Sequence, residues 1–213
     1  RVHEALSIDG RLEEPVYQEV PPLSDFIQVE PDAGAPATEE TEAWVFFDDD
    51  NLYVSARAWD SAPESEWVAN EMRRDNFNVL MNGRVGFLLD TFYDRRNGLI
   101  FNVNAIGGRT DGQMTDERVD TYNGDLNPIW DVRTGLFEHG WTFEAAIPFK
   151  SLRYRSGREQ VWGLNIIRVV RRTNEISYLT ELPAVMGLAG IFQASLAATL
   201  VGLEVPEASR SLE

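Results

Sequence analysis

The sequence predicts an all-β protein: an antiparallel β-sandwich of two sheets, jelly-roll-like, with long loops and little helix. Apolar and polar residues alternate in several short runs, which is the pattern of half-buried strands. Turn-forming Gly, Asp and Asn residues separate these runs. No long stretch repeats with a helical period, and 43% of the 213 residues are hydrophobic, enough to fill one large core.

The first strands are expected after an irregular N-terminal region. Residues 8–12, "IDGRL", read as a short edge or turn segment, and residues 20–41 as a loop rich in Pro, Ala, Asp and Glu. Residues 43–47 and 52–59 flank "DDDN" and predict a hairpin. Asp and Asn suit its turn because their side chains accept hydrogen bonds from nearby backbone amides.

The rest of the chain continues the strand pattern. Residues 65–74 predict a short helix or irregular backbone, and residues 107–127 a long polar loop. Residues 184–203 are apolar and predict one or two final strands, since their glycines and polar residues argue against a membrane span. The other strands are expected at 84–90, 99–104, 141–147, 161–171 and 175–180.

The length and the charge of the chain limit the number of domains and the classes of binding partner. We expect one sandwich domain over residues 1–205 and a tail over residues 206–213 that resembles a cloning scar. The formal charge of −16 repels phosphate backbones, so nucleic acid is an unsuitable partner. The absence of cysteine excludes disulfides and thiolate metal sites. Because the chain starts without Met, we expect a processed or excerpted product that is secreted, periplasmic or associated with a bacterial outer membrane.

Catalysis is not expected. His3 and His139 are the only histidines, one near the terminus and one in a turn, and neither suits a Ser-His-Asp arrangement. Acidic pairs for glycoside hydrolysis are abundant among 35 Asp and Glu residues, but solvated surface acids are the simpler interpretation. A hydrolase using Asp90 or Glu144 is the weakest alternative.

A structural calcium ion is the one cofactor that the residues suggest, and no organic cofactor is expected. Calcium binds six to eight oxygen ligands, and carboxylates cluster around "DDDN". The candidate ligands are Asp48, Asp50 and Asp60. The alternative is that these acids only form the hairpin turn.

Six tryptophans point to a different kind of site. Trp141 and Trp162 share strand faces with apolar residues and belong to the core, whereas Trp59 points to the opposite face of its strand and Trp67 and Trp130 fall in loops. An exposed indole stacks on the apolar C–H face of a sugar ring while neighbouring polar groups bind the hydroxyls. The alternative is that these rings are buried at the sandwich edges.

Six segments in order carry a resemblance to a known family. They are "IDGRLEEPVY" (8–17), "VFFDDDNLYVSARAWD" (45–60), "RRD" (73–75), "LLDTFYDRRNGLIFNVNAIG" (88–107), "GWTFEAAIPFKSLRY" (140–154) and "WGLNIIRVVRR" (162–172). Together they resemble the family-9-like carbohydrate-binding domain, of the type found at the N-terminus of bacterial outer-membrane β-barrel proteins. The resemblance implies a two-sheet sandwich, often stabilised by calcium, in which aromatic residues clamp a saccharide. Tyr17 and Trp59 depart from the residues usual at their positions.

We therefore expect a non-catalytic carbohydrate-binding module of a larger secreted or outer-membrane protein. The alternative is an interaction domain that docks on its own outer-membrane barrel, binds no sugar and exposes an apolar patch near the C-terminus. The expected ligand contacts are Trp59, Trp67, Trp130, Tyr93 and Arg57. A second, strand-borne polar set comprises Asp90, Asn102, Asn104, Glu144, Asn165 and Arg168, for which a buried hydrogen-bond network is an equal alternative.

Overall fold

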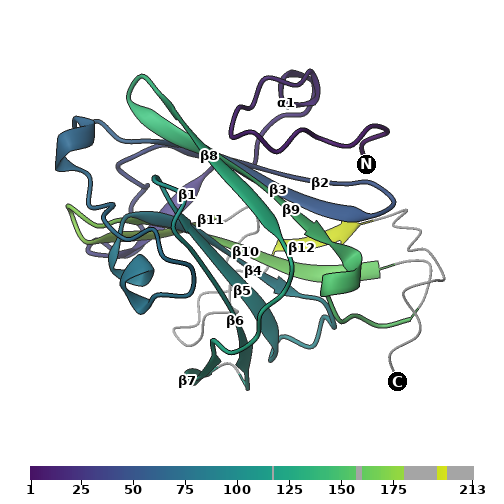
Figure 1. Ribbon diagram of the computed structural model, residues 1–213. Coiled ribbons are helices and arrows are strands. Elements are labelled where there is room, and N and C mark those ends of the chain that lie inside the picture. The colour runs from purple at the N-terminus through teal and green to yellow at the C-terminus, as the bar shows by residue number, and fades with distance from the viewer. Residues whose placement is uncertain (117, 157–159, 180–195, 201–213) are drawn as a thin grey trace.

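The computed structural model describes residues 1–116, 118–156, 160–179 and 196–200, and these form two antiparallel sheets packed face to face (Figure 1). The larger sheet has the order β1-β11-β10-β4-β5-β6-β7, and β12 also pairs with β10. Its strands are β1 (Phe26–Glu30), β4 (Arg84–Asp90), β5 (Gly98–Asn104), β6 (Arg109–Thr115), β7 (Arg118–Asn123), β10 (Gln160–Val170), β11 (Glu175–Leu179) and β12 (Leu196–Leu200). The smaller sheet has the order β2-β3-β9-β8, with β2 (Thr41–Phe47), β3 (Asn51–Trp59), β8 (Asp131–Phe137) and β9 (Gly140–Pro148). The predicted all-β sandwich is confirmed.

The core lies between the sheets and follows from strand alternation. On β3, every second residue from Leu52 to Ala58 faces the larger sheet and is 1% exposed. Three phenylalanine rings bridge the layers: Phe87 stacks on Phe101 at a centroid distance of 5.0 Å and on Phe143 of the other sheet at 6.3 Å. These stacked rings connect the two sheets through one continuous apolar layer.

The hairpin at "DDDN" forms because one aspartate caps its turn. Asp48 Oδ1 accepts hydrogen bonds from the amides of Asp50 at 2.8 Å and Asn51 at 2.7 Å. Its Oδ2 accepts the Tyr53 hydroxyl at 2.6 Å. The turn interpretation therefore accounts for the acidic run.

Four strands were not predicted. Residues 107–127 hold β6 and β7 instead of a long loop, residues 20–41 include β1, and β8 had no prediction. These strands lie at or near sheet edges and place few apolar side chains in the core, so their sequences lack clear alternation. On β6 the buried core-facing residue is Asp111, whose carboxylate accepts the Trp130 indole N–H at 2.7 Å.

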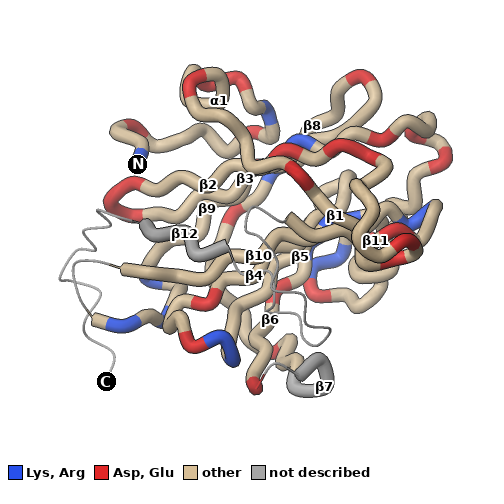
Figure 2. The backbone as a smooth tube through the Cα atoms, turned by 180° about the vertical axis from the view of Figure 1, so that it is seen from behind, with Lys and Arg blue, Asp and Glu red and all other residues tan. Residues whose placement is uncertain are grey.

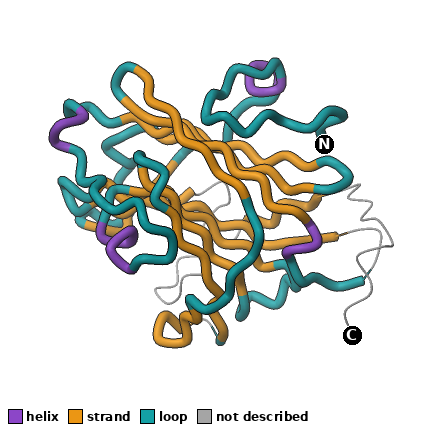
Figure 3. Tube along the Cα trace, viewed as in Figure 1, coloured by secondary structure: helices purple, strands orange, loops and turns teal. Residues whose placement is uncertain are grey.

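Helix is scarce, as expected. Figure 3 shows the helical turns as short breaks between strands and loops: α1 (Val16–Glu19), η1 (Glu64–Glu66), η2 (Phe77–Met81) and η3 (Phe149–Ser151). No helix in the described part of the chain is long and apolar enough to span a membrane. Most of residues 184–203 and the whole tail 206–213 lie outside the described residues, so the domain boundary stays a prediction.

The N-terminal segment covers the outer face of the smaller sheet, above β2 and β3 in Figure 1. Its point of attachment is Glu144 of β9, which is fully buried. Glu144 Oε2 accepts the amides of Asp9 at 3.1 Å and Gly10 at 2.9 Å, and Oε1 accepts the Tyr17 hydroxyl at 2.9 Å. A second apolar cluster surrounds these contacts and comprises Val2, Leu12, Tyr17, Trp44, Phe46 and Tyr53. The "IDGRL" segment is thus a cover of the sheet and not an edge strand.

Gly10 is expected to be essential to this cover. Its φ is +86°, and a Cβ there would lie 2.6 Å from the backbone carbon of Thr134. We expect Gly10→Ala to lower the free energy of unfolding by about 2–4 kcal/mol, measured by denaturant titration. Gly34→Ala is the matched control, because Gly34 has φ +88° but open space around it, so only the backbone cost of about 1–2 kcal/mol applies. Equal losses in the two variants would contradict the steric argument.

The acidic charge is dispersed. Figure 2 shows Asp and Glu positions on many loops around the molecule instead of in one patch. The net charge therefore marks no single binding surface.

Candidate functional site

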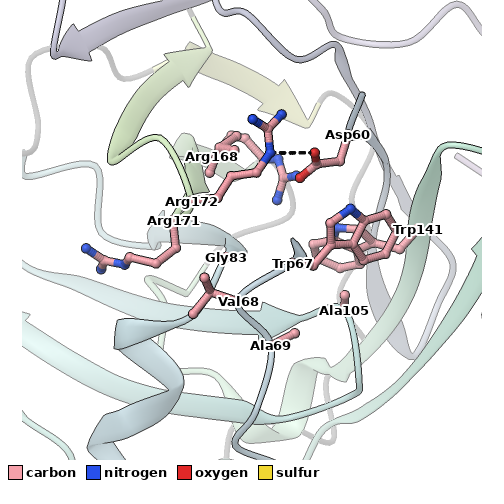
Figure 4. A pocket seen from close by; sticks show the side chains of 11 residues that line it. Asp60, Trp67, Val68, Ala69, Gly83, Ala105, Trp141, Arg168, Arg171 and Arg172 are labelled. Carbon is pink, nitrogen blue, oxygen red and sulfur yellow. Dashed lines mark hydrogen bonds and ion pairs between the residues drawn. The ribbon is translucent and has the colours of Figure 1, made fainter. Parts of the chain in front are cut away.

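A small hollow of about 20 Å³, open to solvent, lies at one end of the sandwich and has room for about one water molecule (Figure 4). It is bounded by the residues after β3, by β9 and by the end of β10. Its lining comprises Asp60, Trp67, Val68, Ala69, Gly83, Ala105, Trp141, Arg168, Val170, Arg171 and Arg172. Aromatic and charged side chains therefore meet at one concave surface.

An ion-pair cluster forms one wall of the hollow. Arg172 donates from Nε to Asp60 Oδ1 at 2.9 Å and from Nη2 to Glu39, and the side chains of both acids are nearly buried. Glu39 also accepts the Ser61 amide at 2.8 Å. Because each acid has several donors, this cluster ties the segment after β3 to the β10–β11 turn.

Arg168 lies deeper, on the core face of β10, and is 2% exposed. Its Nη2 donates one long hydrogen bond to the Trp59 carbonyl at 3.4 Å, and its Nε and Nη1 have no partner among the described residues. Burial lowers the pKa of Arg168 to about 10, against the opposing effect of Asp60, so the guanidinium stays charged at neutral pH. Each buried donor without an acceptor lowers the free energy of unfolding by about 1–3 kcal/mol, so Arg168 destabilises the fold.

Two tryptophans form the other wall. Trp141 is buried, and its ring centroid lies 5.4 Å from the Arg168 guanidinium carbon. Trp67 is partly exposed, and its indole N–H donates to the Ala62 carbonyl at 3.0 Å, which fixes the ring. Figure 4 shows Arg168, Arg172 and Asp60 on one side of the tryptophans, while Arg171 extends away from them.

Of the predicted contact residues, Trp67 and Arg168 line the hollow and the rest lie elsewhere. Trp59 and Arg57 face outward on the smaller sheet. Trp59 meets the Phe137 ring edge-on at 5.6 Å, and the Arg57 guanidinium carbon lies 5.7 Å from the Trp59 centroid. This partly exposed platform is separate from the hollow. Tyr93 lies on the β4–β5 connection beside Arg95.

The expectation of an exposed Trp130 is wrong. Trp130 is 4% exposed and packs edge-on against Phe101 at 5.2 Å, with Arg109 over its ring at 5.2 Å. Its indole N–H is bound to Asp111. The ring and its polar edge are thus buried inside the chain, as in the alternative of burial at the sandwich edge.

Of the second polar set, only Arg168 lines the hollow. Asp90 accepts the amides of Asp94 and Arg95, and Asn104 donates to the Glu71 carbonyl and accepts the Gly108 amide. Asn102 accepts from Arg84, Glu144 holds the N-terminal segment, and Asn165 is buried. All five are buried, and those with described bonds hold loops and the N-terminal cover. Their role as ligand contacts stays a prediction.

The three candidate calcium ligands do not form one site. Asp48 and Asp50 precede β3 and Asp60 follows it, so the nine-residue strand separates them by roughly 30 Å. Asp48 and Asp60 already accept bonds from Tyr53 and Arg172. Over the described ranges, no three His, Asp or Glu side chains are placed to share an ion. These residues do not fit a bound ion, and calcium binding stays a prediction.

The two acids named for a hydrolase lie on opposite outer faces. Asp90 follows the core-facing Leu89 on the larger sheet, and Glu144 follows the core-facing Phe143 on the smaller one. Both sheets therefore separate them, whereas paired glycosidase carboxylates lie within about 10 Å. They cannot act as a pair.

Comparison with known proteins identifies the fold. No family model and no curated protein matches the chain. A family 9 carbohydrate-binding module from Caldicellulosiruptor kristjanssonii, solved with glucose, superposes with a TM-score of 0.60 at 18% identity over 83% of this chain and 82% of the other. The fold is that of a family 9 carbohydrate-binding module.

Two further structures agree with this assignment. The C. kristjanssonii module solved with cellotriose gives a TM-score of 0.58 at 17% identity over 83% of this chain and 80% of its own. A candidate carbohydrate-binding protein from Bacteroides uniformis gives 0.58 at 14% identity over 82% and 85%. At these identities the likeness establishes the family 9 fold and not the ligand.

Several lining residues were missed as site residues. Arg172 received no role, Asp60 was named only for a metal, and Trp141 only for the core. Glu39, which does not line the hollow but pairs with Arg172, was also missed. The signal present in the sequence was "RVVRR" at 168–172, three arginines at a strand end before a turn. Their acidic and aromatic partners are distant in the chain, so only the fold brings them together.

Proposed function

We propose that this chain is a non-catalytic carbohydrate-binding module and that the hollow at Trp67 is its sugar site. The observation that carries the proposal is the pairing of a partly exposed indole with buried charged groups at one concave surface. The shared fold with modules solved with glucose and cellotriose supports it.

The chemistry of the hollow suits a sugar. The C–H face of a sugar ring is apolar and packs on an indole, while hydroxyls exchange hydrogen bonds with charged side chains. Trp67 supplies the first element, and Arg172, Asp60 and Arg168 supply the second. Because the ion pair between Arg172 and Asp60 is already formed, these charged groups lose little freedom on binding.

Replacing Trp67 by alanine is expected to reduce saccharide affinity by about ten- to a hundred-fold, because the stacking surface is lost. Titration calorimetry against glucose and cello-oligosaccharides measures the change. Trp59→Ala tests the platform on the outer sheet face and is expected to leave affinity unchanged. Phe77→Ala is the matched control, since Phe77 is 68% exposed and does not line the hollow. Loss of binding in Trp59→Ala with none in Trp67→Ala would move the site to the platform.

The wider context is part of the proposal. We expect the module to belong to a larger secreted or outer-membrane protein, with a downstream barrel as partner. The alternative of a docking domain without sugar binding predicts co-purification with the rest of its chain and no affinity for any saccharide at millimolar concentration. The apolar patch expected near the C-terminus lies largely outside the described residues.

A further inference from the structure

We infer that the sugar held in this hollow carries a carboxylate, so that the module recognises acidic saccharides such as uronic acid residues, with Arg168 as the partner of the carboxylate. The inference rests on the proposed function and names the class of its ligand. It comes from the bonding state of one buried side chain and of the acids around it.

Arg168 has more donors than acceptors. Of its five N–H groups, one makes a hydrogen bond of 3.4 Å, and the Nε and Nη1 atoms have no acceptor in the described chain. The guanidinium lies on the Trp141 ring, which leaves its N–H edge for an in-plane partner. A planar carboxylate is the group that matches this edge, since it accepts two parallel N–H bonds from one guanidinium.

The neighbouring carboxylates are already engaged. Asp60 accepts Arg172 Nε and the Ala62 amide, and Glu39 accepts Arg172 and Ser61. Glu175 accepts the amide and the hydroxyl of Thr38. In the part of the chain that the structure describes, no carboxylate forms a hydrogen bond with Arg168. These three acids stabilise the charge of Arg168 from a distance, but none accepts a hydrogen bond from its Nε or Nη1. We therefore assign the missing acceptor to a ligand.

The hollow gives the ligand a path to Arg168. Arg168 and Trp67 both line it, and the unpaired N–H groups lie just below its surface, with almost no contact with solvent. The indole of Trp67 sits on a loop segment with only a three-residue helical turn. A carboxylate reaches Arg168 when the Trp67 indole is displaced, and the sugar ring then packs on the same indole.

A neutral sugar satisfies this site less well. A hydroxyl can accept one N–H bond, whereas a carboxylate accepts two parallel N–H bonds from one guanidinium. The hollow is thus expected to discriminate between two sugars that differ only at C6.

Titration calorimetry with glucuronate, galacturonate, glucose and galactose at matched ionic strength tests the inference, with acetate as a probe for the carboxylate alone. We expect each uronate to bind about ten- to a hundred-fold more tightly than its neutral counterpart, and acetate to bind far more weakly than either uronate.

In Arg168→Met the ratio of uronate affinity to neutral-sugar affinity is expected to fall toward one. This variant should fold, since replacing a buried charge by an apolar side chain is often neutral for stability. Arg168→Lys, which keeps the charge without the fork, should fall between.

The outcomes separate the two proposals. Equal affinity for uronates and neutral sugars in the unmodified chain overturns the acidic ligand and leaves the sugar module standing. No affinity for any sugar overturns the sugar module itself. A uronate preference that persists in Arg168→Met places the carboxylate elsewhere and overturns the role of Arg168. Acetate binding as tight as uronate binding overturns the saccharide part.

Discussion

Phe87→Ala is expected to lower the free energy of unfolding by about 3–5 kcal/mol. Phe87 is fully buried and stacks on Phe101 within its own sheet and on Phe143 of the facing sheet. Truncation removes the middle ring of this stack and leaves a cavity that both sheets border, so neither can close it by a local shift. The loss corresponds to a fall in Tm of roughly 6–20 °C for a chain of this size.

Chemical denaturation monitored by circular dichroism measures this effect. Phe77→Ala is the matched control, because the same side chain is removed from a position that is 68% exposed. Its change is expected to stay within about 0.5 kcal/mol. A loss below about 1.5 kcal/mol in Phe87→Ala would show that the sheets repack without the central ring and would contradict the stack as the link between layers.

Glu144→Gln is expected to remove a pH dependence of stability that the unmodified protein has between pH 5 and 8. Burial raises the pKa of Glu144 to about 7 from an ordinary value of 4.5, against the opposing effect of its hydrogen bonds with Tyr17 and the Gly10 and Asp9 amides. Between these two values the folded chain holds a proton that the unfolded chain has released. Rising pH therefore favours unfolding, and the stability present below pH 4.5 is lost as pH passes 7.

The expected size of this loss is roughly 1–3 kcal/mol. Glutamine fits the site because its carbonyl can accept the Gly10 amide while its amide donates to the Tyr17 hydroxyl, which can donate in turn to Ser55. The variant should match the unmodified protein near pH 5 and exceed its stability at pH 8. Urea denaturation at half-unit pH steps measures the difference between the two proteins. A difference that stays constant with pH would refute the raised pKa.

Glu144→Ala distinguishes the effect of the Glu144 charge on stability from the effect of its hydrogen bonds. It leaves the Asp9 and Gly10 amides and the Tyr17 hydroxyl without their acceptor, so it is expected to destabilise the chain at every pH. A fall in Glu144→Ala together with no fall in Glu144→Gln would assign the role of Glu144 to hydrogen bonding of the N-terminal cover.

The predicted strands were those with one apolar and one polar face. Alternation from Leu52 to Ala58 and from Val85 to Leu89 predicts β3 and β4 directly, because each buries one face against the other sheet. The acidic turn at Asp48 was predictable for a similar reason, since its hydrogen bonds are local. In contrast, β6 escaped prediction because Asp111 takes the place of an apolar residue, with Trp130 and Arg74 as distant partners.

By itself, the sequence determined the fold class, the core faces of the main strands and the exclusion of thiol chemistry, since these depend on residue type and local period. Only the tertiary structure decided which polar residues are free to bind. Glu144 and Arg168 have the same appearance in the sequence, as charged residues in apolar strands. Glu144 is satisfied by a segment more than a hundred residues away, whereas Arg168 keeps unpaired donors beside a hollow. Partners that are distant in the chain made this difference, and local patterns do not encode them.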